Sequence, residues 1–217
     1  MKSEKDKLIV ATLLERHGQT FSHQLGISLE RNTPAPLFQW LCAALLMSAR
    51  IPSQRALQAA AALKEAGWTT AEHMADSQWK DRVKVLNSAG YARFDESAAR
   101  MLGETAELLL DKYRGDLRKL REKAKHHPAA EKRLLTEFKG IGDLGADIFL
   151  REVQLVWKEL YPFADRKALD AARQLGLTDT AEGLAALVPR QDFPRLIAAL
   201  IRASLSDDLA TIAGRKG

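Results

Sequence analysis

The sequence predicts an all-α protein, and three observations lead to this expectation. Alanine and leucine dominate a composition that is 46% hydrophobic but only 6% aromatic, whereas strands favour β-branched and aromatic residues. Apolar residues recur at helical spacing along most of the chain. No stretch of strand length alternates between apolar and polar residues. The 217 residues suffice for one large or two small domains with a real core.

Glycine and proline mark the ends of the expected helices in the first half of the chain. An amphipathic helix over residues 3–18 stops at Gly18, and an irregular segment over 19–35 follows it. The helix over 37–49 is apolar nearly all round, which indicates a central, buried helix. The next helices are expected over residues 53–67, 70–75, 76–88 and 96–113.

The remaining helices lie in the second half. A highly charged helix over 116–125 is broken by the residues at 126–128, which include a proline. A short helix over 131–138 and a tight turn over 139–143 precede a longer helix, whose apolar residues at helical spacing extend to Leu160. The last helices are expected over 166–175, 181–188 and 192–203, followed by a further helix or a tail.

The net charge of +5 suits a partner such as nucleic acid or an anionic membrane surface, and by itself it proves neither. The apolar stretch over residues 8–14 is too short to span a membrane and is flanked by charges. It also lacks the cleavage pattern of a signal peptide. We therefore expect a cytoplasmic protein that makes no membrane contact.

Cys42 is the only cysteine, so no disulfide can form within the chain. It lies in an apolar run, where we expect a buried and inert thiol. An iron–sulfur cluster needs several thiolates, so we expect no cluster and no other resident cofactor. His126 and His127 are adjacent and have no nearby ligand pattern, which argues against a metal site there.

The turn Lys139-Gly140-Ile141-Gly142-Asp143 has a pattern that suits the binding of an anion. Glycines on both sides of one apolar residue allow a positive φ and the close approach of another surface. Ile141 can then pack between the two helices while the neighbouring N–H groups point outward. Exposed N–H groups beside a helix N-terminus bind anions, and in a basic protein we expect a phosphate. A plain helix-to-helix turn is the alternative.

The segment FKGIGDLGADIF, residues 138–149, resembles the hairpin of the helix-hairpin-helix DNA glycosylases, the endonuclease III superfamily. In that family an aspartate that opens the next helix follows the hairpin, and Asp165 occupies this place. Upstream, residues 45–50 resemble the family's helix end of the LLSAQ type, and residues 89–96 resemble its glycine-bearing turn before the next helix. These ordered matches extend over residues 36–177, most of the chain.

The resemblance implies two helical domains with a cleft between them. Residues 31–157 would form a barrel-like domain that contains the helix-hairpin-helix motif. Residues 1–30 together with 158–217 would form the second domain. Asp165 belongs to this second domain and would lie at the mouth of the cleft, where binding sites are common.

Asp165 is the candidate catalytic residue. Cleavage of an N-glycosidic bond builds positive charge on the sugar, and a nearby carboxylate can stabilise this charge and orient or deprotonate a water. The alternative is that Asp165 only caps the helix that begins at Arg166, and the two roles are compatible. Asp170, one turn later, is a weaker rival that we expect to face solvent or to pair with Arg173.

By the resemblance, Gly140, Ile141 and Gly142 grip a backbone phosphate, and the carbonyls of the two glycines can hold a monovalent cation. Bifunctional members of the family carry a lysine nucleophile in the residue pair after the second glycine. Here that pair is Asp143-Leu144, and because leucine is no nucleophile we expect a monofunctional enzyme that uses water. An acid beside a phosphate weakens binding, unless Asp143 caps the following helix.

Further DNA contacts are expected outside the two glycines. Arg50 and Tyr91 stand where the family places residues that wedge into the DNA stack when a base is flipped. A solvated cation at a helix C-terminus is the alternative for Arg50, and a core aromatic is the alternative for Tyr91. The candidate phosphate contacts are Lys139, Arg93 and Lys167.

These features predict a monomeric DNA base-excision glycosylase at the nucleoid. It would flip a damaged or mismatched base out of double-stranded DNA and hydrolyse its N-glycosidic bond. One alternative is a bifunctional glycosylase with lyase activity that uses Lys139 or Lys167; others are a non-catalytic helix-hairpin-helix protein that binds DNA and a small helical scaffold. The missing lysine and cluster argue against the oxidised-pyrimidine lyases, and residues 153–165 also resemble the mismatch-thymine and uracil enzymes, so the lesion stays open.

Overall fold

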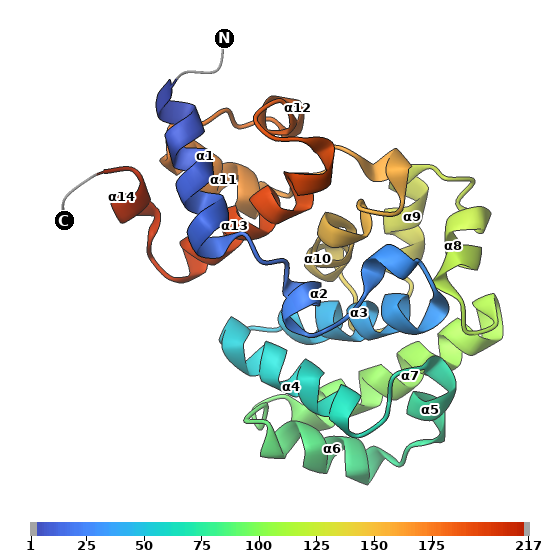
Figure 1. Ribbon diagram of the computed structural model, residues 1–217. Helices are drawn as coiled ribbons and strands as arrows, with labels where there is room; N and C mark the ends of the chain where they lie inside the picture. The colour runs from blue at the N-terminus through green and yellow to red at the C-terminus, as the bar shows by residue number, and fades with distance from the viewer. Residues whose placement is uncertain (1–3, 215–217) are drawn as a thin grey trace.

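The computed structural model describes residues 4–214, which fold into helices joined by short loops (Figure 1). No strand occurs among these residues, so the predicted all-α class is confirmed. The first half contains α1 (Glu4–His17), α2 (Phe21–Gln24), the 3₁₀ helix η1 (Leu29–Arg31), α3 (Pro34–Met47), α4 (Ser53–Glu65), α5 (Ala71–Asp76), α6 (Trp79–Ser88) and α7 (Asp95–Tyr113). The second half contains α8 (Leu117–Lys123), α9 (Pro128–Leu135), α10 (Asp143–Val153), η2 (Lys158–Leu160), α11 (Arg166–Gln174), α12 (Ala181–Ala185), η3 (Arg190–Asp192), α13 (Phe193–Leu205) and α14 (Leu209–Ile212).

Helix α3 lies at the centre of the fold. Nearly all of its residues from Leu37 to Leu46 are buried, as its apolar sequence predicts, and it packs against α4, α7, α8 and α10. The buried Trp40 donates its Nε1–H to the Phe149 carbonyl at 3.1 Å, which joins α3 to α10. The helix that follows the hairpin is therefore attached to the most apolar helix of the protein.

The two ends of the described chain lie together. Helix α1 packs against α13 and α14, and α11 also packs against α13 (Figure 1). Leu209 and Ile212 of α14 are buried, so the C-terminal segment is held by apolar packing. These helices form one group, and α3 to α10 form the other.

The segment between α1 and α3 is bonded to helices of both groups. The Glu152 carboxylate of α10 accepts the backbone N–H groups of Phe21 at 2.7 Å and of Ser22 at 2.8 Å. Arg202 of α13 donates to the Gln19 carbonyl at 2.8 Å. Because the segment is bonded to both α10 and α13, the domain boundary after residue 30 stays a prediction.

Several elements before the hairpin differ from the prediction. Residues 19–35 were expected to be irregular but contain α2 and η1. The first N–H groups of α2 are satisfied by Glu152, which lies far away in the sequence. The helix before the hairpin begins at Pro128 rather than at residue 131, since proline suits the first turn of a helix.

Helix α10 is shorter than predicted. It ends at Val153 instead of continuing to Leu160, and Leu155, beyond its end, is exposed. The Gln154 side chain accepts the Phe163 N–H at 2.9 Å and donates to the Phe163 carbonyl at 2.9 Å. These two hydrogen bonds direct the chain away from the helix axis and into the loop that leads to α11.

Three further expectations concern single features. No helix among the described residues is long and apolar enough to cross a membrane. Cys42 is buried as predicted, and burial raises the pKa of its thiol. Ser3, the predicted first residue of the first helix, lies outside the described residues.

Candidate active site

The hairpin between α9 and α10 is built around Gly140 and Ile141. Gly140 has a φ of +85°, and a Cβ at this position would lie 2.5 Å from Met101 Sδ and 3.3 Å from Leu45 Cδ1. Glycine alone suits both the backbone conformation and this close approach. Ile141 is buried and its N–H donates to the Phe138 carbonyl at 3.0 Å, so its side chain packs inward as predicted.

The N-terminus of α10 carries no side-chain cap. Gly142 is the N-cap residue, and no atom lies within 4 Å of the position that its Cβ would take. Asp143 does not take the alternative role of capping the helix: its side chain is 88% exposed, and its Oδ1 lies 3.8 Å from Lys132 Nζ. Lys132 makes its closer ion pair with Asp147, at 2.7 Å. The uncapped N–H groups are open to an anion such as a phosphate.

The hairpin carbonyls are partly used within the protein. The Lys139 carbonyl accepts the Thr105 hydroxyl at 3.2 Å. The Gly142 carbonyl accepts the Ala146 N–H at 2.9 Å, in the first turn of α10. A carbonyl oxygen has two lone pairs, so this bond leaves one for a cation. The monovalent cation at Gly140 and Gly142 stays a prediction.

Asp165 caps α11 and faces Arg151 at the same time. Its Oδ1 accepts the Ala168 N–H at 3.0 Å, so the expected capping role is confirmed. Its Oδ2 lies 3.2 Å from Arg151 Nε, and the two side chains are only 3% and 7% exposed. Neither of these two atoms has a well-aligned hydrogen-bond partner. The two groups therefore interact as buried opposite charges.

A cavity of about 410 Å³ brings the hairpin helix, Asp165 and α13 together. Leu144, directly after the hairpin, is half-exposed and lines it. Burial, and then the charge of Arg151, lower the pKa of Lys167, while Asp165 acts in the opposite direction. The lining residues are Leu144, Asp147, Asp165, Arg166, Lys167, Asp170, Ala171, Gln174 and Ser204. Two predicted site residues, Asp165 and Lys167, thus line the same cavity as Leu144, the residue directly after the hairpin.

Asp170, the weaker rival for the catalytic role, also lines this cavity. It pairs with Arg173 at 2.8 Å, as expected, and its other oxygen lies 3.7 Å from Arg166 Nε. Its partners lie on α11 itself, so Asp170 belongs to the surface of that helix.

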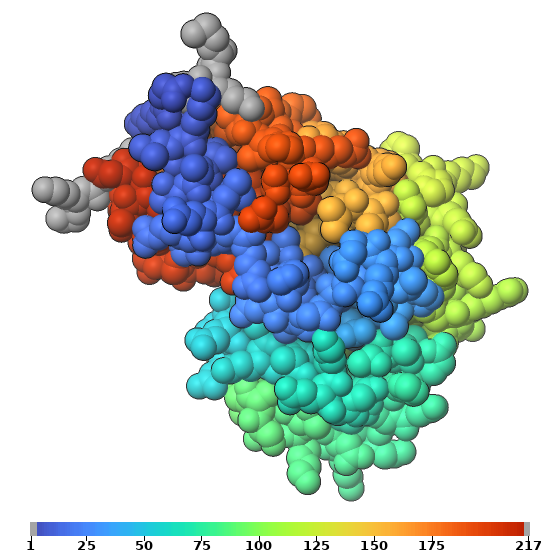
Figure 2. Space-filling view, viewed as in Figure 1, coloured from blue at the N-terminus to red at the C-terminus, as the bar shows by residue number. Residues whose placement is uncertain are grey.

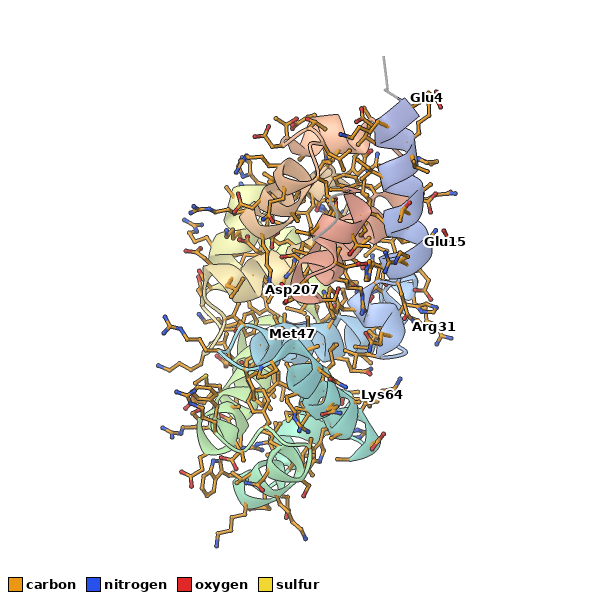
Figure 3. All side chains as sticks on the ribbon, turned by 90° about the vertical axis from the view of Figure 1, so that its left-hand side faces the viewer. Glu4, Glu15, Arg31, Met47, Lys64 and Asp207 are labelled. Atoms are coloured by element: carbon orange, nitrogen blue, oxygen red, sulfur yellow. The ribbon has the colours of Figure 1, made fainter. Side chains whose placement is uncertain are left out.

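A larger hollow of about 970 Å³ lies between the segment after α1, the start of α4 and the end of α13. Figure 2 shows it as the notch on the left, between the red C-terminal helices and the cyan α4. Figure 3 turns this side to the viewer, with Met47 below and Asp207 above. Arg195 and Arg202 line the hollow but donate to backbone carbonyls at 3.0 Å and 2.8 Å. No predicted site residue lines it.

The two predicted wedge residues lie in different environments. Tyr91 is 1% exposed and donates its hydroxyl proton to the Leu46 carbonyl at 2.8 Å. Burial raises the pKa of Tyr91 to about 12. Tyr91 is therefore a core aromatic, and its prediction as a DNA wedge is wrong for this structure. Arg50 is exposed in the loop after α3.

The predicted phosphate contacts outside the cavity are also exposed. Arg93 lies with its guanidinium carbon 5.2 Å from the centre of the Phe94 ring, and Lys139 lies in the hairpin. Both side chains are accessible to a partner, although neither contacts the cavity that Asp165 lines.

The sequence did not reveal the polar residues in the last turn of α10. Arg151 pairs with Asp165, Glu152 caps α2, and Gln154 holds the backbone after α10. All three are buried. Their signal in the sequence is a group of polar residues directly after the apolar residues 148–150, because a buried polar side chain needs a specific partner.

No model of a known protein family matches the chain, and no curated protein matches it significantly. Among solved structures, a non-covalent endonuclease III–DNA complex matches with a TM-score of 0.50. A trapped covalent endonuclease III–DNA intermediate, an estranged-adenine complex, matches with a TM-score of 0.49. In both cases the identity is 16%, and the match covers 84% of this chain and 85% of the other. The first match shows that this chain has the all-α, two-domain fold of endonuclease III.

Proposed function

We propose that this protein is a DNA base-excision glycosylase that hydrolyses the N-glycosidic bond of a damaged or mismatched base. The observation that carries the proposal is the position of Asp165 at the start of α11, in a cavity that it shares with Leu144 of the hairpin helix. A phosphate bound at the N-terminus of α10 would bring the neighbouring sugar to this cavity. The carboxylate can then stabilise the positive charge that develops on the sugar as the base leaves.

The proposed partner is double-stranded DNA with one flipped base. A solved structure of the same fold is endonuclease III bound to DNA, and the uncapped N–H groups of α10 offer a site for a backbone phosphate. A monovalent cation at the carbonyls of Gly140 and Gly142 would neutralise part of the phosphate charge. We further propose a monomer that acts at the nucleoid in the cytoplasm, without an iron–sulfur cluster. The cations proposed to contact DNA are Arg50, Arg93, Lys139 and Lys167.

The proposed enzyme is monofunctional. Leu144 lines the cavity and belongs to the residue pair in which bifunctional members of the family that the sequence resembles carry a lysine. Its side chain offers no nucleophile. One observation favours a second candidate. Lys167 lines the same cavity, and burial lowers the pKa of its amine, which increases the neutral fraction. This second candidate is a bifunctional glycosylase and lyase with Lys167 as the nucleophile.

An excision assay on a panel of duplexes, each with one lesion, tests the proposal. The wild type is expected to excise at least one base and to yield strand breaks only after alkali. Asp165→Asn is expected to lose this activity roughly a hundredfold or more. Asp116→Asn is the matched control, because Asp116 also caps a helix and pairs with an arginine, outside the cavity.

If the wild type and Asp165→Asn both bind DNA tightly but excise no base, the proposed enzymatic activity is contradicted. A non-catalytic DNA-binding protein would then be favoured. Borohydride distinguishes the second candidate, since it traps only a Schiff base between the enzyme and DNA. Trapping by the wild type that is lost in Lys167→Met would replace the monofunctional enzyme by a bifunctional one.

A further inference from the structure

Arg151 lies in the last turn of α10 and is buried against Asp165. Its Nε atom is 3.2 Å from Asp165 Oδ2. The other carboxylate oxygen, Oδ1, accepts the Ala168 N–H at 3.0 Å. Each oxygen of the carboxylate thus has its own positive neighbour, one from α10 and one from the N-terminus of α11.

Stability alone does not explain a buried ion pair at this place. Moving two charges out of water costs free energy that their attraction often fails to offset, and apolar side chains of similar volume are frequently as stable or more so. This pair also lies at the wall of a cavity, because Asp165 lines it. A desolvated charge pair in such a position points to the chemistry of the cavity rather than to the core.

On the basis of the glycosylase function proposed above, we propose that Arg151 is a positioning residue for Asp165. Arg151 fixes the direction of Oδ2, while the N-terminus of α11 fixes Oδ1. The carboxylate is then oriented before the substrate arrives, as stabilisation of a developing charge requires. Arg151 acts through Asp165 and does not itself touch the reacting atoms.

Helix α10 connects this pair to the proposed phosphate site. The hairpin lies at its N-terminus and Arg151 in its last turn, within one helix of 11 residues. Gln154, directly after the helix, holds Phe163 by two hydrogen bonds of 2.9 Å, two residues before Asp165. Trp40 fixes the middle of α10 to α3. A rigid helix therefore sets the position of the carboxylate relative to the phosphate, which suits a reaction that needs accurate placement.

Other charged side chains lie around Asp165. The charged side chains that also line the cavity are Asp147, paired with Lys132 at 2.7 Å, Asp170, paired with Arg173 at 2.8 Å, Arg166, which is solvent-exposed, and Lys167. Lys167 lines the cavity, and its charge interacts with that of Asp165. Its effect is separated from that of Arg151 by a parallel Lys167→Met variant.

Single-turnover excision by Arg151→Met and Arg151→Lys tests the role of Arg151. Arg151→Met is expected to slow excision roughly a hundredfold. Arg151→Lys keeps the charge but not the planar guanidinium, so it should recover part of the rate. Arg118→Met, which removes the partner of the other capping aspartate, is the matched control and should leave the rate unchanged.

A second measurement tests the pair without catalysis. Melting temperatures are compared for Arg151→Met, Asp165→Asn and the double variant. The double variant is expected to lose less than the sum of the two single losses, because each single change leaves one buried charge without its partner. Should Arg151→Met fail to fold, Arg151→Lys gives the kinetic test, with a rate below the wild type as the expected result.

Three outcomes would overturn the inference. A wild-type rate of excision in Arg151→Met would do so even where Asp165→Asn abolishes excision. Additive losses of melting temperature would show that the two groups do not interact. If the wild type excises no base, the proposed function itself fails, and coupling in the thermal measurements would then identify the pair as a structural contact only.

Discussion

Two aspartates of this protein cap helices and pair with arginines, and they differ in what surrounds them. Asp116 caps α8 through the Arg118 N–H at 2.9 Å, and the side chain of Arg118, two residues further along, is 42% exposed. Asp165 caps α11 through the Ala168 N–H, but its arginine comes from another helix and is buried. The first arrangement depends on local sequence alone, whereas the second depends on the tertiary fold.

The comparison separates a structural cap from a candidate catalytic group. Burial tends to raise the pKa of Asp116, but the hydrogen bonds from Arg118 outweigh it, and the pKa is lowered. That pair is close to solvent, where ion pairs contribute little to stability. Asp165 also caps the start of a helix, yet its carboxylate lines a cavity beside the hairpin. The position in the protein, rather than the capping bond, therefore distinguishes Asp165 from Asp116.

The largest expected effect on stability is the loss of the buried arginine. Arg151→Met should lower the free energy of unfolding by about 3–5 kcal/mol, because it leaves the Asp165 carboxylate buried without its partner. Arg118→Met should lower it by less than about 1 kcal/mol, since that pair is partly solvated. Urea unfolding of the two variants measures the difference. Equal losses would remove the distinction between the two pairs.

A third buried carboxylate extends the comparison, because it lacks an arginine of its own. Glu131 of α9 is fully buried near Glu159, whose carboxylate is held by Arg121 at 2.6 Å and 2.7 Å. Burial, and secondly the Glu159 carboxylate, raise the pKa of Glu131 from 4.5 to about 8. The folded state thus binds this proton more tightly than the unfolded state. Its contribution to stability is present at low pH and is lost as the pH rises from about 4.5 to about 8.

Glu131→Gln should therefore change stability in a pH-dependent way. Glutamine cannot ionise, so the variant should be about as stable as the wild type near pH 4 and roughly 2–4 kcal/mol more stable near pH 9. Urea unfolding at these two pH values measures the effect. Glu159→Gln is the control of opposite sign, because Arg121 lowers the pKa of Glu159 against the effect of burial. If Glu131→Gln gains the same unfolding free energy at both pH values, the raised pKa does not belong to Glu131.

The two hairpin glycines provide a smaller contrast. Gly140→Ala forces a Cβ onto a φ of +85° and against Met101, which should cost about 1–3 kcal/mol of unfolding free energy. Gly142→Ala meets open space at a φ of −89°, so its effect on stability should stay within about 0.5 kcal/mol. Thermal unfolding of both variants measures this. A loss in Gly142→Ala as large as in Gly140→Ala would show that the N-terminus of α10 is not open.

Features whose signal is local were predicted correctly. The apolar run of α3 gave a buried helix, and the glycine pattern of the hairpin gave a positive φ at Gly140 with Ile141 packed inward. Asp165 was expected both as a cap and as a cavity residue. The cap was predictable because the geometry of a helix N-terminus places the Ala168 N–H within reach of the Asp165 side chain.

Features that depend on a distant partner could not be predicted. Tyr91 follows a glycine turn, which locates the loop but does not say that its hydroxyl reaches the Leu46 carbonyl. Arg151 and Glu152 each find a partner on another segment, and no periodicity of a single helix identifies that segment. Tertiary packing decides these contacts, and they are the ones that surround the candidate site.

The smallest expected change in stability is that of Leu144→Lys, and it bears most directly on the chemistry. Because Leu144 is half-exposed, the unfolding free energy should change by no more than about 0.5 kcal/mol. The new amine would enter the cavity that Asp165 lines, and a sugar carbon bound there could form a Schiff base with it. The variant should then give a borohydride-trapped complex with DNA that the wild type and Leu144→Met do not give. Excision without trapping would mean that residue 144 faces away from the sugar.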